Sequence, residues 1–389
     1  MLESRGAACV GTLDGGCKSD DADDTAGGRT RVIRPRPEVA ATPPTVHGGP
    51  RGGDGRHVRL DFSVSLNAWG PAPCVLEAIR SAPVDAYPDP ESVAPRKAAA
   101  ARWERPMDEV VFGAGAAELI HAVCHAFLRA GDTALVPTPT FGEYARAVSL
   151  CGARVLQGIA APPSFALDLD SISAAVVRHR PRLLFLCAPN TPTGQAFARD
   201  ELRAVADACT ASDTLLVLDQ SFDGFLREPL GTALPGHAAV LHLRSITKDH
   251  ALAGVRAGFA VGPAPVAAAV QRVRVPWASS TLAQAAAVAA MSDEAADYVA
   301  STVPRLRFER ELLEAALARL RLPVVRSGTH FVLAAVGDAA RLARALEDAH
   351  HVRVRDCTSF GLPGHVRIAA RTPDENNKLV RALEAVCST

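Results

Sequence analysis

The sequence of 389 residues has no long apolar run, no excess of either charge and no paired cysteine motif. A membrane-spanning helix needs about 20 consecutive apolar residues, and no such run occurs. Basic residues (Lys plus Arg) and acidic residues (Asp plus Glu) number 42 each, so nothing indicates a polyanionic partner such as nucleic acid. We therefore expect neither a membrane nor a nucleic-acid partner.

The chain also lacks the patterns of secretion and of metal binding. Its start, MLESRGAACVGTLDGG, shows no basic and then apolar signal peptide. Nine cysteines at irregular spacing form no CxxC pair, so neither zinc nor a disulfide framework is favoured. Cys124, Cys151 and Cys187 stand in apolar surroundings and are predicted to be small core residues. A reducing cytoplasm is the expected location.

Composition divides the chain into three parts. Residues 1–56 contain almost no large apolar side chain, so we expect disorder, because burial cannot offset the entropy of ordering them. The alternative is an arm that orders over an active site or a partner. Residues 57–275 are predicted to form a large domain, with residues 57–85 as an N-terminal arm, and residues 276–389 a smaller α+β domain.

Between residues 110 and 262, apolar runs alternate with amphipathic helices. This order predicts an α/β fold with a mostly parallel, doubly wound sheet. Outside this region, a short strand is expected within 58–73 and further strands within 322–337 and at 365–370. Helices are expected at 73–80, within 276–291 and 297–320, at 338–350 and at 374–386.

A glycine loop lies in the segment VVFGAGAAELIHAV. Gly113 and Gly115 permit a tight turn from strand to helix, and the amides that follow lie at a helix N-terminus suited to a phosphate. The loop does not match the dinucleotide pattern GxGxxG, because Glu118 occupies the third glycine position. It also lacks the Lys-Ser/Thr pair of a P-loop. Nicotinamide enzymes and P-loop enzymes are both disfavoured.

Two charged residues follow apolar runs. Lys248 comes just after the run at 238–243, where α/β folds place chemistry at the carboxyl edge of the sheet. Asp219 ends the run of TLLVLDQSFDGF. A carboxylate at the end of a buried strand is costly unless it is paired, so Asp219 either caps a turn or serves a site.

The order of these motifs resembles the pyridoxal-phosphate (PLP)-dependent aminotransferase class I/II superfamily, fold type I, over roughly residues 58–389. The resemblance rests on Ser245, Lys248 and Arg256, preceded by Asp219 and by the Pro-Thr-Gly loop at 192–194. The closest branches are L-threonine-O-3-phosphate decarboxylase and histidinol-phosphate aminotransferase. The motifs that indicate these branches are PTFGEY (139–144), PW…LAQAAAVAA (276–290) and RDCTSFGL…VRIAARTPDEN (355–376), of which the last two lean towards the decarboxylase.

The resemblance implies a large domain with the parallel sheet, a smaller α+β domain and pyridoxal 5'-phosphate as the cofactor. Lys248 would form the Schiff base and then move protons at the substrate through a quinonoid. Asp219 would pair with the pyridinium nitrogen and keep the ring an electron sink.

Further residues are assigned to the cofactor by the same resemblance. Phe141 would stack on the ring. The phosphate would be held by Ser245, Arg256 and the amides near Ala116 and Ala117, a charge-assisted arrangement at a helix N-terminus.

The resemblance also assigns contacts to the substrate and to a second subunit. Arg367 would clamp the substrate carboxylate, because its fork geometry suits that group. Arg355 would bind a second anion, and Asn67 would lie near the substrate. Tyr87 would reach the phosphate of a neighbouring subunit, which implies a homodimer with shared sites.

Three positions depart from the family pattern. Thr191 replaces an asparagine, and Phe222 a tyrosine, that bond the O3′ oxygen of the cofactor in relatives. His330 replaces an asparagine and is either an acid or base or a hydrogen-bonded filler. Losing both O3′ donors changes how the quinonoid is handled and puts standard transamination in doubt.

We therefore predict a PLP enzyme acting at the α-carbon of an amino acid, aminotransferase-like or threonine-phosphate-decarboxylase-like and diverged. The alternatives are an O₂-dependent oxidase or monooxygenase of specialised metabolism, a histidinol-phosphate-type aminotransferase, and a PLP-fold module without catalysis. Retention of Lys248, Asp219, Arg256 and Arg367 argues against such a module.

Overall fold

The apolar runs between residues 110 and 261 form one large sheet. The computed structural model describes residues 33–49, 58–231, 234 and 237–387. Among them the sheet has seven strands: β2 (Val110–Gly113), β3 (Thr133–Leu135), β4 (Arg154–Leu156), β5 (Leu183–Cys187), β6 (Leu215–Asp219), β7 (Val240–Ser245) and β8 (Gly258–Val261). Their order is β2-β8-β7-β6-β5-β3-β4, and only β8 is antiparallel to its neighbours. The predicted mostly parallel α/β sheet is confirmed.

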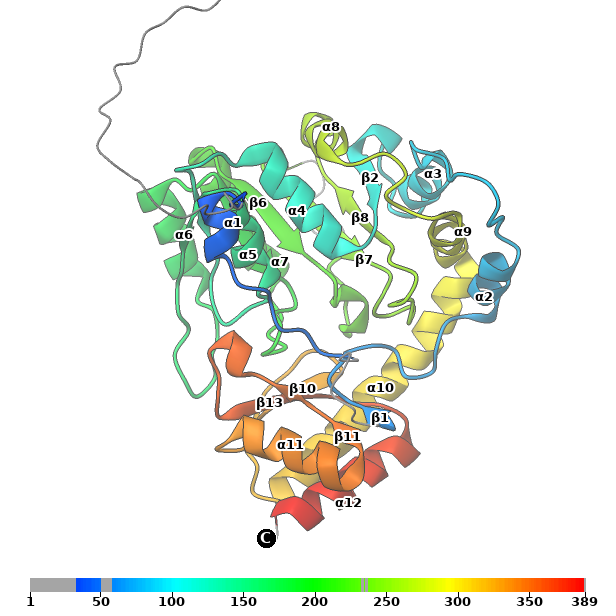
Figure 1. Cartoon of the computed structure of the whole chain (residues 1–389), viewed down its shortest axis with the longest axis vertical. Coiled ribbons are helices and arrows are strands. Elements are labelled where there is room, and N and C mark those ends of the chain that lie inside the picture. Colours follow the sequence, from blue (N-terminus) through cyan, green and yellow to red (C-terminus); the bar gives the residue numbers. More distant parts are fainter. Residues whose placement is uncertain (1–32, 50–57, 232–233, 235–236, 388–389) are drawn as a thin grey trace, which may run out of the picture. The chain divides into compact units, whose positions relative to one another are not determined.

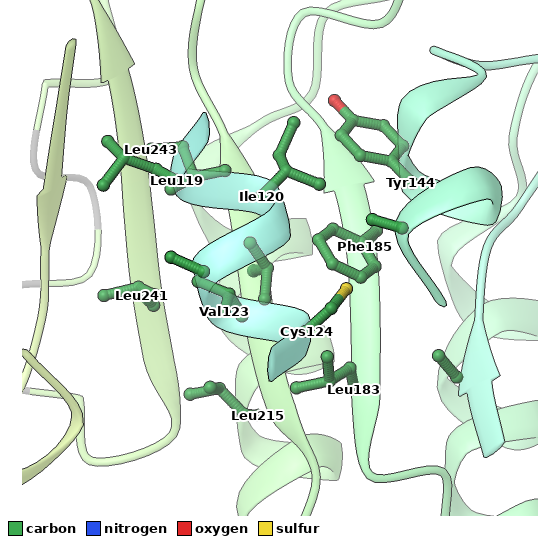
Figure 2. Packing of buried hydrophobic residues seen from close by; sticks show 14 of the residues in the cluster. Leu119, Ile120, Val123, Cys124, Tyr144, Leu183, Phe185, Leu215, Leu241 and Leu243 are labelled. Carbon is green, nitrogen blue, oxygen red and sulfur yellow. The ribbon is translucent and has the colours of Figure 1, made fainter. Parts of the chain in front are cut away.

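Helices pack on both faces of this sheet, because successive residues of each buried strand point to opposite sides. On one face Leu183, Phe185, Leu215 and Leu241 pack against α4 (Ala116–Phe127), as Figure 2 shows. The other helices of this region are α2 (Pro73–Arg80), α3 (Val93–Arg102), α5 (Glu143–Leu150), α6 (Leu169–His179), α7 (Arg199–Ala211), α8 (Ala264–Val273) and α9 (Thr281–Ala290). α6 and α7 supply Val176 and Val205 to the core on the opposite face.

A second, antiparallel sheet lies in the C-terminal part of the chain. Its order is β12-β13-β10-β9, with bounds β9 (Val324–Val325), β10 (Phe331–Ala335), β12 (Arg355–Asp356) and β13 (His365–Ala369). It packs against α10 (Asp293–Arg319), α11 (Ala339–His350) and α12 (Pro373–Cys387), which gather around it in Figure 1. Short elements complete the fold: α1 (Pro37–Ala41), β1 (Leu60–Asp61), β11 (Val352–Arg353) and the 3₁₀ turns Met107–Glu109, Asp223–Phe225 and Thr358–Phe360.

The expected domain boundary at residue 276 does not coincide with the division between the cores. Ala283 and Ala286 of α9 pack with Phe112 and Phe259 of the large sheet. Phe62, expected in an arm of the large domain, lies in the C-terminal core, because β1 pairs with β11. The buried residues near the start of α10 pack with the core of the large sheet, and those near its end pack with the core of the small sheet. The division between the two cores therefore falls within this helix.

The expected disorder of residues 1–56 is wrong for the part from residue 37 to 49. Residues 37–41 form α1, which contacts α5, and the segment after it runs toward β1 in Figure 1. Residues 1–32 and 50–57 lie outside the described residues.

The predicted core role of the cysteines is confirmed, since Cys124 and Cys187 are buried and Cys151 packs against the same cluster. None of the helices in the described ranges combines the length and apolar character that a membrane crossing requires.

Candidate active site at the carboxyl edge of the large sheet

Three adjacent strands deliver polar side chains to one cavity. β5, β6 and β7 end at Cys187, Asp219 and Ser245, and the register places Cys187 beside Asp219. Each of these residues continues the alternating series that faces α4, so all three lie on the same face. They line a cavity of about 590 Å³, to which Lys248 also contributes. The sheet therefore brings Lys248 and Asp219 together as the sequence predicts.

Asp219 is buried and receives two hydrogen bonds. The Tyr144 hydroxyl donates to its Oδ2 (2.7 Å), and the Ser221 amide donates to its Oδ1 (2.9 Å). Tyr144 is fully buried and stacked on Phe185, with ring centroids 5.0 Å apart. Burial and then the charge of Asp219 raise the pKa of Tyr144, so the phenol keeps its proton and remains a donor.

Tyr144 is a site residue that sequence reasoning missed. The signal was present in PTFGEY, because Phe141 was expected at the cofactor and Tyr144 follows it within one turn, where its amide donates to the Phe141 carbonyl (3.3 Å). In the structure the rings of Phe141 and Tyr144 meet edge to face, with centroids 5.5 Å apart. Phe141 lines the cavity as expected, and Tyr144 extends beneath it to Asp219.

The Lys248 amine lies among cationic groups. Its Nζ is 5.8 Å from the ring centre of Phe222. Removal from water lowers the pKa of Lys248 to about 8, and the charges of Arg367 and Arg256 act in the same direction, against the opposing effect of Asp219. A substantial fraction of the amine is therefore neutral near that pH, which is the form that attacks a carbonyl.

One end of the cavity is built for an anion. Ala116 and Ala117 begin α4, and Ser245, Thr247 and Arg256 line the same end. The hydroxyls of Ser245 and Thr247 lie 2.6 Å apart. A helix N-terminus, two hydroxyls and a guanidinium together suit a phosphate.

Glycine keeps this end open. Gly115 has φ +94°, and a Cβ there would lie 2.9 Å from Nη2 of Arg256. At Gly258 a Cβ would come within 2.9 Å of the Ala116 amide nitrogen. Any side chain at either position would displace the groups that face the anion.

Arg367 joins the small sheet to a loop of the large one. From β13 its Nη1 donates to Thr191 Oγ1 (2.7 Å) and its Nη2 to the Ser63 carbonyl (2.8 Å). Burial lowers the pKa of Arg367 to about 10, well above neutrality, so the group stays cationic. Thr191, which departs from the family asparagine, is therefore the partner of the arginine expected to hold the substrate carboxylate.

Residues 44–48, here called the strap, also line the cavity. Arg355, the other arginine expected at the substrate, donates through Nη2 to the Val46 carbonyl (2.6 Å) and to Ser359 Oγ (2.8 Å). His47 Nε2 lies 3.1 Å from Oε1 of Glu143 at the start of α5. Part of the segment expected to be disordered is thus an arm over the cavity, as the alternative interpretation held.

Three of the predicted residues, Asn67, His330 and Tyr87, do not line this cavity. The amide of Asn67 donates to the Asp249 carbonyl (3.0 Å) and to Thr302 Oγ1 (2.8 Å), contacts that hold the backbone near Lys248. His330 is fully buried and stacked on Phe225, with centroids 3.8 Å apart. The substrate role of Asn67 and the acid or base role of His330 stay predictions.

The His330 imidazole is neutral. Burial lowers its pKa well below the usual range, and the charges of Arg367 and Lys248 lower it further. Neither ring nitrogen has a hydrogen-bond partner within the described part of the chain.

Tyr87 lies on the outer surface. It is 84% exposed and contacts Trp277, whose ring centroid is 5.3 Å away. An exposed tyrosine cannot reach the cavity of its own chain from this position. Its expected contact with the phosphate of a second subunit stays a prediction.

Comparison with known proteins decides the family. The family model for aminotransferase class I and II matches residues 59–383. This chain belongs to that family. It is 35% identical over 330 residues to a histidinol-phosphate aminotransferase of Halorubrum lacusprofundi, covering 83% of this chain and 88% of that protein. A relative of the same name from Symbiobacterium thermophilum is 34% identical over 339 residues, covering 85% of this chain and 91% of that protein.

Solved structures agree with the aminotransferase fold. The histidinol-phosphate aminotransferase of Sinorhizobium meliloti, in complex with pyridoxal-5'-phosphate, superposes with a TM-score of 0.81 at 26% identity, covering 92% of this chain and 99% of that chain. The N-succinyldiaminopimelate aminotransferase of Mycobacterium tuberculosis gives a TM-score of 0.76 at 25% identity, covering 84% and 92%. This aminotransferase is therefore a PLP-dependent enzyme of fold type I, as predicted.

The residues of this aminotransferase fit the cofactor. The anion end of the cavity suits its phosphate, and the buried carboxylate of Asp219 suits a protonated ring nitrogen. Lys248 would hold the aldehyde carbon, and Phe141 would lie against the ring. Two of the departures seen in the sequence line the same cavity: Phe222, which carries no hydroxyl, and Thr191, whose Oγ1 accepts a hydrogen bond from Arg367.

Proposed function

We propose that this chain is a histidinol-phosphate-type aminotransferase. It would transfer the amino group of histidinol phosphate, or of a close analogue, to a keto acid. The relatives named above support this alternative over the threonine-phosphate-decarboxylase interpretation. The observation that carries the proposal is a single cavity that presents Lys248, Asp219 and Arg367 to one reacting centre.

Each group has a separate task in this proposal. The cofactor, when bound, supplies an aldehyde for the substrate amine and a ring that withdraws electrons. Lys248 would take a proton from the substrate carbon that bears nitrogen and would give it to the carbon on the other side of that nitrogen. Asp219, oriented by Tyr144, keeps a proton at the ring nitrogen, and Arg367 orients the acidic group of the amine or of the keto acid.

We also propose that the enzyme is a homodimer with shared sites. Tyr87 and Trp277 expose aromatic rings side by side, and Val84 and Val275 nearby are also exposed. Such an apolar group on a surface favours a protein partner. A second copy would bring Tyr87 to the phosphate end of the neighbouring cavity.

The test follows products from histidinol phosphate and 2-oxoglutarate. We expect glutamate and the corresponding ketone in equal amounts, without CO₂ release or O₂ uptake. Lys248→Ala should lower turnover by roughly 10²–10⁴-fold, since it removes the proton carrier. Lys97→Ala, which removes an exposed lysine of α3, is the control and should keep full turnover.

Release of CO₂ in proportion to amine consumed would replace this proposal with decarboxylation. Uptake of O₂ in the same proportion would replace it with oxidation. If histidinol phosphate gives no product while another amine is turned over, histidinol phosphate is not the substrate.

A further inference from the structure

Glu143 is a buried carboxylate in the wall of the cavity. It is 5% exposed, and its two oxygens face two imidazoles. His47 Nε2 is 3.1 Å from Oε1, and His121 Nε2 is 3.1 Å from Oε2. Arg146 Nη1 donates to Oε2 (3.3 Å). Each carboxylate oxygen of Glu143 thus contacts one imidazole.

The Glu143 side chain is ionised at neutral pH. Burial acts to raise its pKa, but hydrogen bonds from Thr45 and His121 and the charges of Arg146 and His47 outweigh it, and the pKa lies below its usual value. The carboxylate is therefore an acceptor at neutral pH, and each facing ring nitrogen donates to it.

The two imidazoles differ in their surroundings. His121 belongs to α4 and does not line the cavity, whereas His47 lines it. The His47 side chain is 50% exposed, and its ring centroid lies 5.8 Å from that of Phe141. The His47 imidazole thus lies in the cavity between the Glu143 carboxylate and the Phe141 ring.

The backbone of the strap and of Gly49, which follows it, is held independently of this imidazole. Val46 O accepts from Arg355 (2.6 Å), Gly49 O accepts from Arg353 Nη1 (2.9 Å), and the Gly49 amide donates to Ser63 Oγ (2.9 Å). The His47 side chain can therefore rotate toward solvent while the strap keeps its place.

We propose that Glu143 Oε1 and Phe141 form an imidazole subsite of the substrate cavity, filled by His47 and taken over by the imidazole of the substrate. The inference rests on the proposed function, because histidinol phosphate supplies the imidazole. When the substrate imidazole displaces His47, one N–H···O hydrogen bond to the carboxylate of Glu143 is replaced by an equivalent one. The displaced His47 imidazole then forms hydrogen bonds with water. Glu143 and His47 are then specificity-determining residues for imidazole-bearing amines.

Imidazole itself is the probe. We would titrate it calorimetrically into the holoenzyme and its variants. His47→Ala opens the subsite, so imidazole should bind about tenfold more tightly or better than to wild type, as expected for a hydrogen bond to a charged group. Adding Glu143→Gln to His47→Ala should remove most of that gain.

Two further variants make the test specific. His47→Gln keeps a donor to Glu143 and should bind imidazole like wild type. His125→Ala removes an exposed histidine of α4 that does not line the cavity, and it should also behave like wild type. Equal imidazole binding to wild type, His47→Ala and the double variant would overturn the subsite.

The titration requires no turnover, so its outcome is separable from the proposed function. If histidinol phosphate is not converted but His47→Ala binds imidazole tightly, the subsite stands and the substrate is another imidazole-bearing amine. If histidinol phosphate is converted and imidazole binding is the same in every variant, only the subsite is rejected. With the subsite present, His47→Ala should also lower KM for histidinol phosphate more than KM for the same amine without the ring.

Discussion

At the scale of single residues, the pair Asp219 and Tyr144 would set the environment of the cofactor ring. Asp219 alone would be a buried carboxylate with one amide donor, and such a group is costly to keep ionised. The phenol supplies a second donor at 2.7 Å, inside a stack with Phe185 that fixes its direction. Tyr144 is therefore a positioning residue for the carboxylate.

Replacing Tyr144 by phenylalanine tests this role. Tyr144→Phe keeps the ring packing but leaves Oδ2 of Asp219 without its donor, which costs about 1–3 kcal/mol. We expect weaker cofactor binding and about tenfold lower kcat, with the pH dependence of cofactor absorbance shifted. Spectral titration with pyridoxal phosphate measures the first effect.

Tyr298→Phe is the matched control. Its hydroxyl donates to the Trp69 carbonyl (2.9 Å), and the residue does not line the cavity. Unchanged cofactor affinity and absorbance in Tyr144→Phe would show that the phenol does not act through Asp219.

The departures from the family pattern have different consequences in the structure. Thr191 bonds Arg367, so the threonine is tied to the arginine expected to hold the substrate. Phe222 contacts Phe331 edge to face and lies near Lys248, so the position expected to carry a tyrosine has the ring without the hydroxyl. His330 is buried and neutral one shell further out. Contacts within the site thus account for Thr191 and Phe222, whereas both ring nitrogens of His330 lack a hydrogen-bond partner among the described residues.

At the scale of elements, the start of α4 is shaped by a glycine. Gly115 holds φ +94° directly before Ala116, and a Cβ there would lie 2.9 Å from Nη2 of Arg256. The loop must therefore satisfy two conditions, a left-handed backbone and space for a guanidinium.

The two conditions can be separated with two glycines. Gly115→Ala and Gly131→Ala both place alanine at positive φ, +94° and +91°, but only Gly115 has a neighbour within 4 Å. Each should lose about 1–3 kcal/mol of unfolding free energy from the backbone alone. Only Gly115→Ala should also weaken pyridoxal phosphate binding, by about tenfold, because it displaces Arg256 from a charge-assisted contact.

Thermal denaturation measures the loss of unfolding free energy, and spectral titration measures the binding of pyridoxal phosphate. If both variants bind the cofactor equally well, Arg256 and the start of α4 do not form the phosphate site.

At the scale of the whole molecule, one exposed aromatic pair is held in place by two segments far apart in sequence. The loop at 83–92 is tied to α9 because Thr281 donates to the Pro83 carbonyl and Gln284 donates to the Asp89 carbonyl (2.8 Å). These bonds bring Tyr87 beside Trp277. A fixed apolar surface of this kind suits a second copy of the chain.

Loss of the pair should weaken the dimer. We expect Tyr87→Ala with Trp277→Ala to raise the dimer dissociation constant by roughly tenfold or more, because buried aromatic residues dominate such interfaces. Sedimentation velocity over a concentration series measures it. Phe308→Ala removes an aromatic that is 59% exposed on α10 and serves as the control. A dimer that dissociates equally in both variants, or a monomeric wild type, would contradict the proposed interface.

The sequence by itself determined the architecture and the reacting groups of this protein. Alternating apolar runs led to a mostly parallel sheet, since the hydrophobic period is a local property. The strand that carries Asp219 and the loop that carries Lys248 follow from those runs, because parallel strands bring their carboxyl ends to one edge. The motif around Lys248 then indicated the cofactor, and the family comparison confirmed it.

Only the tertiary structure decided which distant groups meet. The strap is polar and poor in large apolar residues, so its own composition predicted disorder. It is ordered because Arg355 binds the carbonyl of Val46 and Arg353 binds that of Gly49 just after the strap, and both arginines come about 300 residues later in the chain. The imidazole partners of Glu143, the phenol partner of Asp219 and the partners of Arg367 lie on other elements, so these contacts depend on tertiary packing. Local sequence patterns carry no information on such contacts, because hydrogen bonds between remote segments form only when the cores bring those segments together.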